Sequence, residues 1–246
     1  KIIGRGGVGM DNIDVDYARE KGINVINTPA ASSASVAELV FAHLFGMVRF
    51  LFDSNRQMPI SGDSEFKSLK KSYAKGKELA GKTLGIVGFG RIGQEVAKRA
   101  IGLGMNVIAH DKFVEEANIT LEFFNGEKKS FTIETESLEN VLKNSDFVTL
   151  HIPKIGDKAV IGAEEIGMMK TGTGIVNAAR GGVIDETALM FALDKEKLAY
   201  AGLDVFENEP TPSIHLCMHN AVSLTPHIGA ATLEAQDRIG TELAEQ

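Results

Sequence analysis

The sequence contains no tryptophan and only one cysteine among its 246 residues. With Cys217 alone the chain cannot form an internal disulfide, which suits a reducing compartment, so we expect a cytoplasmic protein. Positive charge is also scarce, because 26 lysines and arginines face 33 aspartates and glutamates, for a formal net charge of -7. Such a chain lacks the basic surface that binds nucleic acid. A small molecule is therefore the expected partner.

Long apolar runs are absent as well. The longest, residues 36 to 52, is shorter than the roughly 20 apolar residues that a membrane span needs, and it contains Glu38, His43 and Arg49. We therefore expect no membrane association and interpret this run as a buried helix. Ser35 and Glu38 predict a capping box at its start, and apolar residues on nearly all sides predict burial against another domain or subunit. His43 is then a core or interface residue.

Glycine, in contrast, is abundant, and the motif G-x-G-x-x-G occurs twice. The second copy, Gly88, Gly90 and Gly93 in "GFGRIG", follows the apolar run "TLGIV" and opens a helical pattern. Asp111 stands at the end of the next apolar run. Together these features are typical of the dinucleotide-binding fingerprint, in which backbone N–H groups at a helix N-terminus bind the pyrophosphate and the acid binds the ribose.

The first copy, "GRGGVG" at residues 4 to 9, has no acid at the corresponding place, where "INVINTP" follows. A glycine-rich turn after a strand presents backbone N–H groups to an anion, and Arg5 adds a fixed positive charge. The motif therefore indicates a site for a small carboxylate or phosphate. A turn that needs glycine only for its positive φ is equally compatible with these residues.

From about residue 83 onward, short apolar runs alternate with helical patterns, which predicts a doubly wound parallel sheet covered on both faces. Residues 1 to 30 have the pattern of a second α/β unit. We expect a nucleotide-binding domain at 36–230, with a dimerisation helix at its start. Residues 1–35 and 231–246 are expected to be the remnant of a substrate-binding domain whose N-terminal part is missing from this sequence, because the chain opens inside an apolar run rather than with a methionine.

Residues 121 to 134, "LEFFNGEKKSFTIE", differ from this pattern. Asn125 and Gly126 between alternating apolar residues predict a surface β-hairpin inserted into the nucleotide domain. A disordered loop is the alternative.

Polar residues follow several of the later apolar runs, in a sheet whose carboxyl edge is where ligands bind. They are His151, Arg180, Asp204, Glu209 and His227. An arginine can hold a carboxylate through two hydrogen bonds, a carboxylate can orient a histidine ring, and the histidine can exchange a proton with a substrate oxygen. Beside a nicotinamide, this set performs hydride transfer.

Three of these residues, Arg180, Glu209 and His227, occur in an order and in local motifs that resemble the D-2-hydroxyacid dehydrogenase family of NAD-dependent oxidoreductases. The motifs cover essentially the whole chain: "GRGGVGMDNID", "INVINTP", "SVAEL", "GKTLGIVGFGRIG", "NAARGGVIDE", "AGLDVFENEP" and "LTPHIGA". The resemblance implies an α/β enzyme with a Rossmann-type NAD domain, a flavodoxin-like substrate domain, here truncated, and a homodimeric assembly.

The resemblance also implies a role for individual residues. Arg180 would bind the substrate carboxylate, His227 would be the acid–base and Glu209 its hydrogen-bonded partner, while the backbone at Arg5, Gly6 and Gly7 would help to hold the carboxylate. Residues expected to contact NAD are Thr28, Gly88, Gly90, Arg91, Ile92, Gly93, Asp111, Ile152, Ala178, Asp204 and Gly229.

Some alternatives stay open from the sequence. A dinucleotide-sensing corepressor-like binding protein shares the fold and even these residues, although the acidic composition disfavours it. His215, Cys217 and His219 superficially suggest a metal site, but no further ligands accompany them, and we expect no metal. The lysines at 67, 70, 71, 75 and 77 predict a solvated segment. In some members of the family a basic residue near this position reaches the substrate of a partner subunit.

Overall fold

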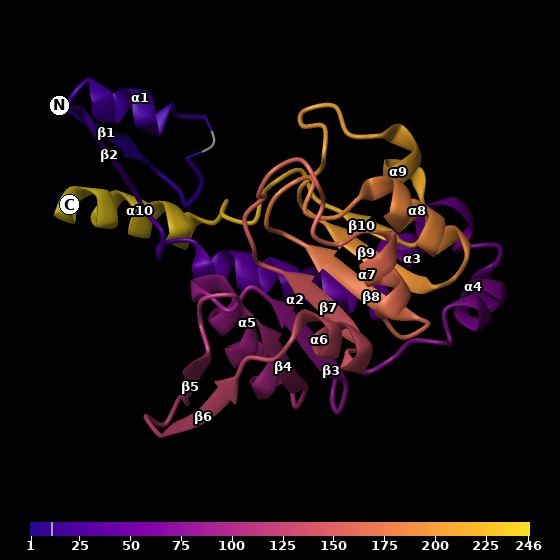
Figure 1. Cartoon of the computed structure of the whole chain (residues 1–246). Helices are drawn as coiled ribbons and strands as arrows, with labels where there is room; N and C mark the ends of the chain where they lie inside the picture. The colour runs from indigo at the N-terminus through magenta and orange to yellow at the C-terminus, as the bar shows by residue number, and fades with distance from the viewer. Residues whose placement is uncertain (11) are drawn as a thin grey trace.

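A parallel six-stranded sheet forms the centre of the molecule in a computed structural model that describes residues 1–10 and 12–246 (Figure 1). In spatial order its strands are β10 (Val222–Leu224), β9 (Leu198–Leu203), β8 (Thr173–Asn177), β7 (Phe147–Leu150), β3 (Thr83–Val87) and β4 (Asn106–His110). The chain runs outward in one direction from β3 to β4 and in the other from β7 to β10. A crevice at the carboxyl ends of β3 and β7 is therefore the expected ligand site.

Helices cover both faces of this sheet and enclose two apolar cores. On one face lie α2 (Ser33–Val48) and α5 (Arg91–Gly102), and on the other lie α6 (Leu138–Asn144), α7 (Ala163–Met168) and α8 (Glu186–Asp194). Strands β7 and β8 are buried along their whole length, as central parallel strands covered on both sides must be. The predicted doubly wound parallel sheet is confirmed.

The start of the buried helix α2 differs from the prediction. The helix begins at Ser33, after Ser32, and no side chain caps it. The Ser35 hydroxyl lies 2.8 Å from the hydroxyl of Thr232, and the Glu38 carboxylate accepts a hydrogen bond of 2.9 Å from Arg99. The predicted capping box is therefore wrong, because Ser35 and Glu38 are the third and sixth residues of the helix and bind partners from distant segments.

Helix α2 is also shorter than the predicted apolar run. It ends at Val48, and Phe50, in the left-handed conformation (φ 54), is the N-cap of the next helix, α3 (Leu51–Ser61). The axes of α2 and α3 differ by 55°. Within the described residues, no single helix is long and apolar enough to cross a membrane, although α2 and α3 taken together pass that test. The sheet of the same chain and α5 bury most of α2, whereas Phe45 on this helix is 42% exposed. The predicted role of α2 in a dimer stays a prediction.

The segment after α2, which contains α3 and the next helix, is peripheral. Neither α3 nor α4 (Phe66–Ser72) contains a buried residue, and the lysines at 67, 70 and 71 are exposed on α4. Among the exposed apolar side chains of this segment, Leu51 and Ile60 are 63% and 74% accessible. The predicted solvated character of the lysines agrees with their exposure.

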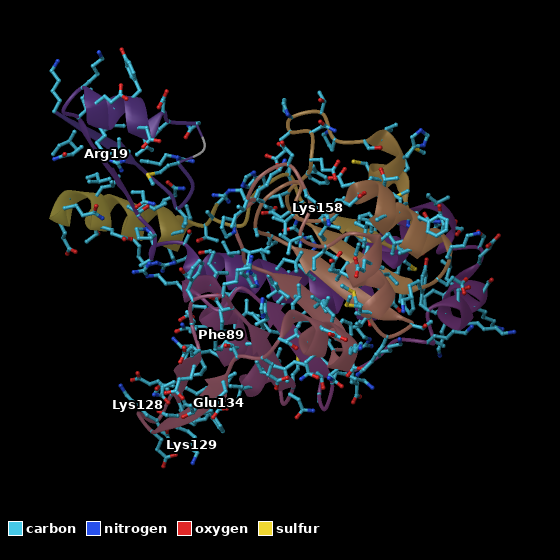
Figure 2. All side chains as sticks on the ribbon, in the orientation of Figure 1. Arg19, Phe89, Lys128, Lys129, Glu134 and Lys158 are labelled. Atoms are coloured by element: carbon cyan, nitrogen blue, oxygen red, sulfur yellow. The ribbon has the colours of Figure 1, made fainter. Side chains whose placement is uncertain are left out.

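The predicted β-hairpin is confirmed, although it starts at Glu116 rather than at residue 121. It pairs β5 (Glu116–Glu122) with β6 (Lys128–Glu134) in antiparallel register, and Gly126 in the turn has a φ of 82°. The hairpin projects from the sheet edge next to β4, with Lys128 and Lys129 near its tip (Figure 2). Its inner residue Ile119 packs into the core of α2 and α5.

A smaller unit lies beside the central sheet. The parallel strands β1 (Ile2–Arg5) and β2 (Asn24–Asn27), the helix α1 (Val15–Glu20) and the C-terminal helix α10 (Leu233–Glu245) make up this unit (Figure 1). Glu242 on α10 accepts a hydrogen bond of 3.0 Å from the Ala31 backbone, and Arg238 donates one of 2.7 Å to the Ala31 carbonyl. The two ends of the chain therefore meet, whereas the assignment of 1–35 and 231–246 to a substrate domain stays a prediction.

Candidate active site

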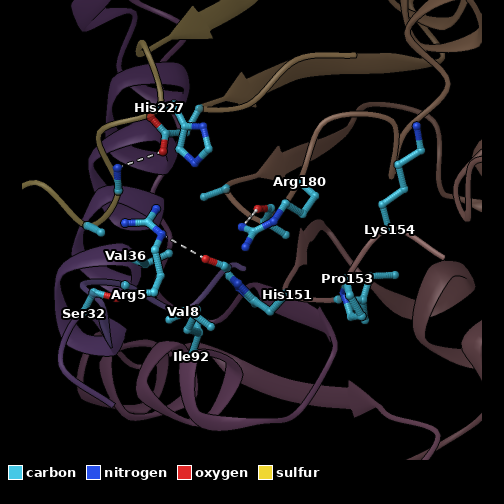
Figure 3. Close-up of a pocket in the computed structure, with 18 of the residues that line it drawn as sticks. Arg5, Val8, Ser32, Val36, Ile92, His151, Pro153, Lys154, Arg180 and His227 are labelled. Atoms are coloured by element: carbon cyan, nitrogen blue, oxygen red, sulfur yellow. Dashed lines mark hydrogen bonds between the residues drawn. The ribbon is translucent and has the colours of Figure 1, made fainter. Parts of the chain in front are cut away.

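A cavity of about 650 Å³ lies at the carboxyl edge of the sheet, between the sheet and the loop after β1 (Figure 3). Predicted site residues from several segments meet on its wall. They are Arg5, Gly6, Gly7, Ile92, Ile152, Ala178, Arg180, Asp204, His227 and Gly229. The sequence-based argument that polar residues after successive parallel strands converge is thus supported by their common location.

The glycine-rich turn after β3 has the close backbone contacts that the fingerprint requires. Gly88 has a φ of 96°, and a Cβ there would lie 2.4 Å from the carbonyl oxygen of His151. A Cβ at Gly93 would lie 2.2 Å from the carbonyl oxygen of Gly88, so α5 packs directly against the turn. Gly90 precedes α5 and has open space on its side-chain position. This cradle fits a pyrophosphate at the N-terminus of α5.

Asp111, directly after β4, is tied to that turn. Its carboxylate accepts hydrogen bonds from the backbone of Phe89 at 2.6 Å, Phe113 at 2.8 Å and Val114 at 3.1 Å. Partial burial alone would raise the pKa of Asp111, but these three N–H donors outweigh it and lower the pKa below its ordinary value. Asp111 is therefore ionised at neutral pH. Its predicted contact with a ribose stays a prediction.

The loop after β1 is organised differently from the predicted anion site. Gly7 donates its backbone N–H to the Thr28 hydroxyl at 2.8 Å, so this N–H is already used. Arg5 donates to the carbonyls of Gly6 at 2.8 Å and Gly9 at 3.2 Å. Thr28, which was expected to contact the cofactor, is fully buried and does not line the cavity. Its hydroxyl holds the glycine loop against β2. The predicted contact of Thr28 with the cofactor stays a prediction.

His227 and Glu209 form a hydrogen-bonded pair at the sheet edge. The distance between His227 Nδ1 and Glu209 Oε2 is 2.8 Å, and Glu209 Oε1 accepts a hydrogen bond of 3.0 Å from the Phe206 backbone. A carboxylate only accepts, so Nδ1 carries the proton and Nε2 of the neutral ring is the atom able to take another. The His227 side chain is 50% exposed, which leaves it accessible from the cavity that it lines.

Arg180 extends into the same cavity from the loop after β8 (Figure 3). Asn177, the last residue of β8, donates a hydrogen bond of 2.9 Å to the Arg180 carbonyl, and the Arg180 guanidinium donates one of 2.7 Å to the Ala179 carbonyl. The next residue must be a glycine, because a Cβ at position 181 would lie 1.7 Å from the Phe206 carbonyl oxygen. The end of the strand thus fixes the backbone from which Arg180 starts.

His151 contributes an unsatisfied polar atom to the cavity wall. Its Nε2 lies 3.0 Å from the Thr149 hydroxyl. Its Nδ1 is buried and has no hydrogen-bond partner among the residues that the structure describes. Burial lowers the pKa of His151 to about 3, so the ring is neutral. A buried unpartnered nitrogen beside a cradle for a pyrophosphate fits a site built for a polar cofactor.

Sequence reasoning missed one charged residue of the cavity, Lys154. It lies on the loop after β7, and its ammonium group packs over Gly182, where a Cβ would lie 2.8 Å from Nζ. Its position after "HIP", directly beyond the end of a buried strand, is the signal that was available in the sequence.

The suspected metal residues do not assemble. Within residues 1–10 and 12–246, no group of three or more histidine, cysteine, aspartate or glutamate side chains is arranged to hold a metal ion. His219 Nδ1 accepts a hydrogen bond of 3.1 Å from the Ala221 backbone, and its Nε2 lies 3.5 Å from Asp194. His219 therefore serves the local structure between α9 (Ile214–Met218) and β10.

Comparison with known proteins decides the family. The family model for the D-isomer specific 2-hydroxyacid dehydrogenase, NAD binding domain, matches residues 41–229. The chain belongs to this family. Among solved structures, the D-lactate dehydrogenase from Aquifex aeolicus complexed with NAD and lactic acid matches with a TM-score of 0.76 at 32% identity, over 100% of this chain and 74% of that one. The Rossmann-type fold, the NAD cofactor and the dehydrogenase class predicted for this chain are thereby confirmed.

Two curated relatives carry different names. The hydroxypyruvate reductase of Thermotoga maritima is 47% identical, over 100% of this chain and 76% of that protein. The D-3-phosphoglycerate dehydrogenase of Methanocaldococcus jannaschii is 44% identical, over 100% of this chain but 44% of that protein. The chain thus spans less than half the length of this second relative. The family is common to both, whereas the substrates in their names differ.

Proposed function

We propose that this protein oxidises D-3-phosphoglycerate to 3-phosphohydroxypyruvate with NAD, a step of serine biosynthesis, in the cytoplasm. The observation that carries the proposal is the hydrogen-bonded pair of His227 and Glu209 on the wall of a cavity that Arg180 also lines. A proton acceptor and a carboxylate-binding cation beside a dinucleotide cradle are what the oxidation of a 2-hydroxy acid needs.

The residues divide the chemistry among them. Bound NAD supplies the hydride acceptor. Nε2 of neutral His227 takes the proton of the substrate hydroxyl, while Glu209 holds the ring through Nδ1 and stabilises the imidazolium that forms. Arg180 binds the substrate carboxylate through its planar guanidinium. In the reverse direction the imidazolium returns the proton to the carbonyl oxygen.

The charge of the cavity supports a substrate with two anionic groups. Among the described residues that line it, Arg5, Lys154 and Arg180 are cationic, and Asp204 is the acidic one. After a substrate carboxylate is bound, these side chains still leave the cavity with a net positive charge. The phosphate of phosphoglycerate would offset this charge. The relatives named phosphoglycerate dehydrogenase add support from sequence.

A hydroxypyruvate or glyoxylate reductase of the same family is the second candidate. The relative that favours it is named hydroxypyruvate reductase, and this chain spans 76% of it. The same three side chains would perform the reduction, with a substrate that carries one anionic group. A corepressor-like protein could carry the same groups, so turnover of a hydroxy acid is the measurement that separates it from both enzymes.

Steady-state kinetics of the purified protein separates these candidates. We expect kcat/KM for 3-phosphoglycerate to exceed the values for glycerate and lactate, and the value for phosphohydroxypyruvate to exceed those for hydroxypyruvate and glyoxylate. Lys154→Ala should raise the KM for 3-phosphoglycerate roughly tenfold, since one charge-assisted contact is worth about 1.5 kcal/mol or more, and leave the KM for glycerate unchanged. Lys158→Ala is the matched control, because Lys158 is exposed on the same loop but does not line the cavity (Figure 2). Preference for the unphosphorylated acids would overturn the proposal.

We further propose that the protein is a homodimer. The predicted interface is α2, and α3 and α4 add support, since the exposed apolar residues Leu51, Met58, Ile60 and Phe66 lie on helices without any buried residue. Apolar groups on such a segment gain from burial against a second copy. Light scattering of the purified protein should give twice the mass of the chain. The variant Ile60→Glu should give the mass of the monomer.

A further inference from the structure

Asp204, at the end of β9, organises the loop that carries His227. It is 1% exposed. Its Oδ1 accepts hydrogen bonds from the Thr225 hydroxyl at 2.6 Å and the Ile228 backbone at 2.8 Å, and its Oδ2 accepts one from the Gly229 backbone at 2.8 Å. One buried carboxylate therefore fixes the chain on both sides of His227.

This fixation matters because His227 has an unusual backbone conformation. Its φ is 56°, in the left-handed region that residues with side chains rarely adopt, and such a conformation persists only where neighbouring contacts impose it. A Cβ at Gly229 would lie 3.0 Å from Asp204 Oδ2, so the glycine allows the carboxylate to approach. The direction of the His227 ring toward Glu209 thus depends on the bonds that Asp204 makes.

A buried histidine on α2 continues the same chain of hydrogen bonds. His43 is 2% exposed, with Nε2 at 3.1 Å from the Thr225 hydroxyl and Nδ1 at 2.9 Å from the Ser223 hydroxyl. Thr225 gives its only hydroxyl proton to Asp204, so it must accept from His43 Nε2–H, and Nδ1 must accept from Ser223. Burial lowers the pKa of His43 despite the opposing charge of Asp204, which keeps the ring in this neutral tautomer.

Helix α2 packs closely on β9 at this ring. A Cβ at Gly202, on β9, would lie 2.8 Å from the His43 Cβ, so the glycine lets the helix that carries His43 approach the strand. An apolar residue would fill this core position without the cost of desolvating an imidazole. The two hydrogen bonds of His43 offset that cost and reach toward the site, which an apolar residue could not do.

We propose that His43 is a positioning residue for the hydride-transfer reaction, acting on His227 through Thr225 and Asp204. This inference rests on the proposed role of His227 as the acid–base. The hydrogen bond from His43 holds the Thr225 hydroxyl with its proton directed at Asp204, and Asp204 in turn holds the backbone of 228 and 229. The hydrogen bonds run in the order Ser223, His43, Thr225, Asp204. A substitution should therefore lower kcat more strongly the closer it lies to the loop that carries His227.

Variants that remove single hydrogen bonds test this order. His43→Leu should lower kcat roughly tenfold, the equivalent of one hydrogen bond of about 1.4 kcal/mol. Thr225→Val should lower it further, and Ser223→Ala less. The KM for the hydroxy acid should stay within about twofold, because Arg180, which would bind the carboxylate, follows another strand. His43→Gln, whose amide can still donate to Thr225, should recover most of kcat.

Two further measurements separate positioning from core packing. Val40→Ala removes buried volume from the same helix without touching the chain of hydrogen bonds, and it should lower Tm but not kcat. Amide hydrogen exchange at Ile228 and Gly229, which needs no catalysis, should accelerate in His43→Leu and Thr225→Val and stay unchanged in Val40→Ala.

Each outcome is decisive for the proposal. A wild-type kcat in His43→Leu, or an equal loss in His43→Leu and His43→Gln, would show that His43 is only a core residue. Additive losses in the double variant His43→Leu/Thr225→Val would show that the two act separately. If His43→Leu does not fold, Ser223→Ala and the exchange data carry the test. A protein that turns over no hydroxy acid but shows the expected exchange pattern would refute the proposed function and leave the positioning chain intact.

Discussion

The two sides of the cavity are built in different ways. On the sheet side, His227, Glu209 and Asp204 follow strands that pair within the six-stranded sheet, and each side chain is fixed by at least one hydrogen bond to a neighbouring segment. On the other side, β1 and β2 pair only with each other within the described residues, and Ile2 of β1 is 63% exposed. The hydrogen bond that the Gly7 N–H donates to the Thr28 hydroxyl and contacts with α10 support the loop after β1.

This difference indicates which steps each side can perform. Proton transfer needs groups held to within a fraction of an ångström, and only the sheet side offers that constraint. The β1 side contributes the charge of Arg5, which follows a strand of a two-stranded, partly exposed sheet. Substitutions on the sheet side should therefore change kcat, and substitutions on the β1 side should change substrate affinity.

The largest effect is expected at His227. His227→Ala should lower kcat by roughly 100 to 10,000-fold, the usual contribution of general acid–base catalysis, with NAD affinity within a few-fold. Stopped-flow turnover and fluorescence titration of NAD measure the two quantities. His215→Ala, on the exposed face of α9, is the control. A kcat near that of the wild type would remove His227 from the mechanism.

Cofactor choice should depend on the charge of Asp111. We expect a preference for NAD over NADP of roughly a hundredfold in kcat/KM, because the phosphate of NADP would meet an ionised carboxylate. Asp111→Asn keeps an oxygen acceptor for the neighbouring N–H groups and removes the charge, so the preference should fall about tenfold while the fold is retained. Equal use of both cofactors by the wild type would contradict this role.

His151 should make the folded state sensitive to mild acid. Its pKa is about 3 in the folded protein and near 6.5 when unfolded, so below pH 6.5 the unfolded state binds the proton and stability falls as the pH is lowered. The loss from pH 7.5 to pH 5 should be about 2 kcal/mol. Urea unfolding at both pH values measures it. His151→Gln should remove most of this loss, and an identical pH dependence in the variant would show that the ring charges freely in the folded state.

The smallest effect is expected on the β1 side. Thr28→Val removes the acceptor for the Gly7 N–H and should raise the KM for the hydroxy acid a few-fold, with NAD affinity unchanged, since Thr28 lies outside the cavity wall. Isothermal titration of NAD and initial rates test both statements. Weaker NAD binding in this variant would restore Thr28 to the cofactor site, as the sequence resemblance implied.

Local patterns in the sequence predicted features that depend on neighbouring residues. The glycines at 88, 90 and 93 indicated a close backbone approach, and Asn125 with Gly126 predicted the hairpin, because positive φ and absent side chains leave a direct signature. The prediction of a capping box at Ser35 and Glu38 failed because it took only neighbouring residues into account. Its pattern is local, but the partners that bind these side chains, Thr232 and Arg99, come from distant segments.

The sequence by itself determined the doubly wound sheet, the dinucleotide cradle and the set of polar residues at the strand ends, since hydrophobic periodicity and glycine spacing encode them residue by residue. Only the tertiary structure decided how those residues are held. That His43 reaches Thr225 and through it Asp204, that Lys154 lines the cavity, and that Thr28 accepts a hydrogen bond from Gly7 all depend on packing between segments far apart in the chain. Hydrogen bonds between such distant segments do not occur at a fixed separation along the sequence, so no sequence pattern predicts them.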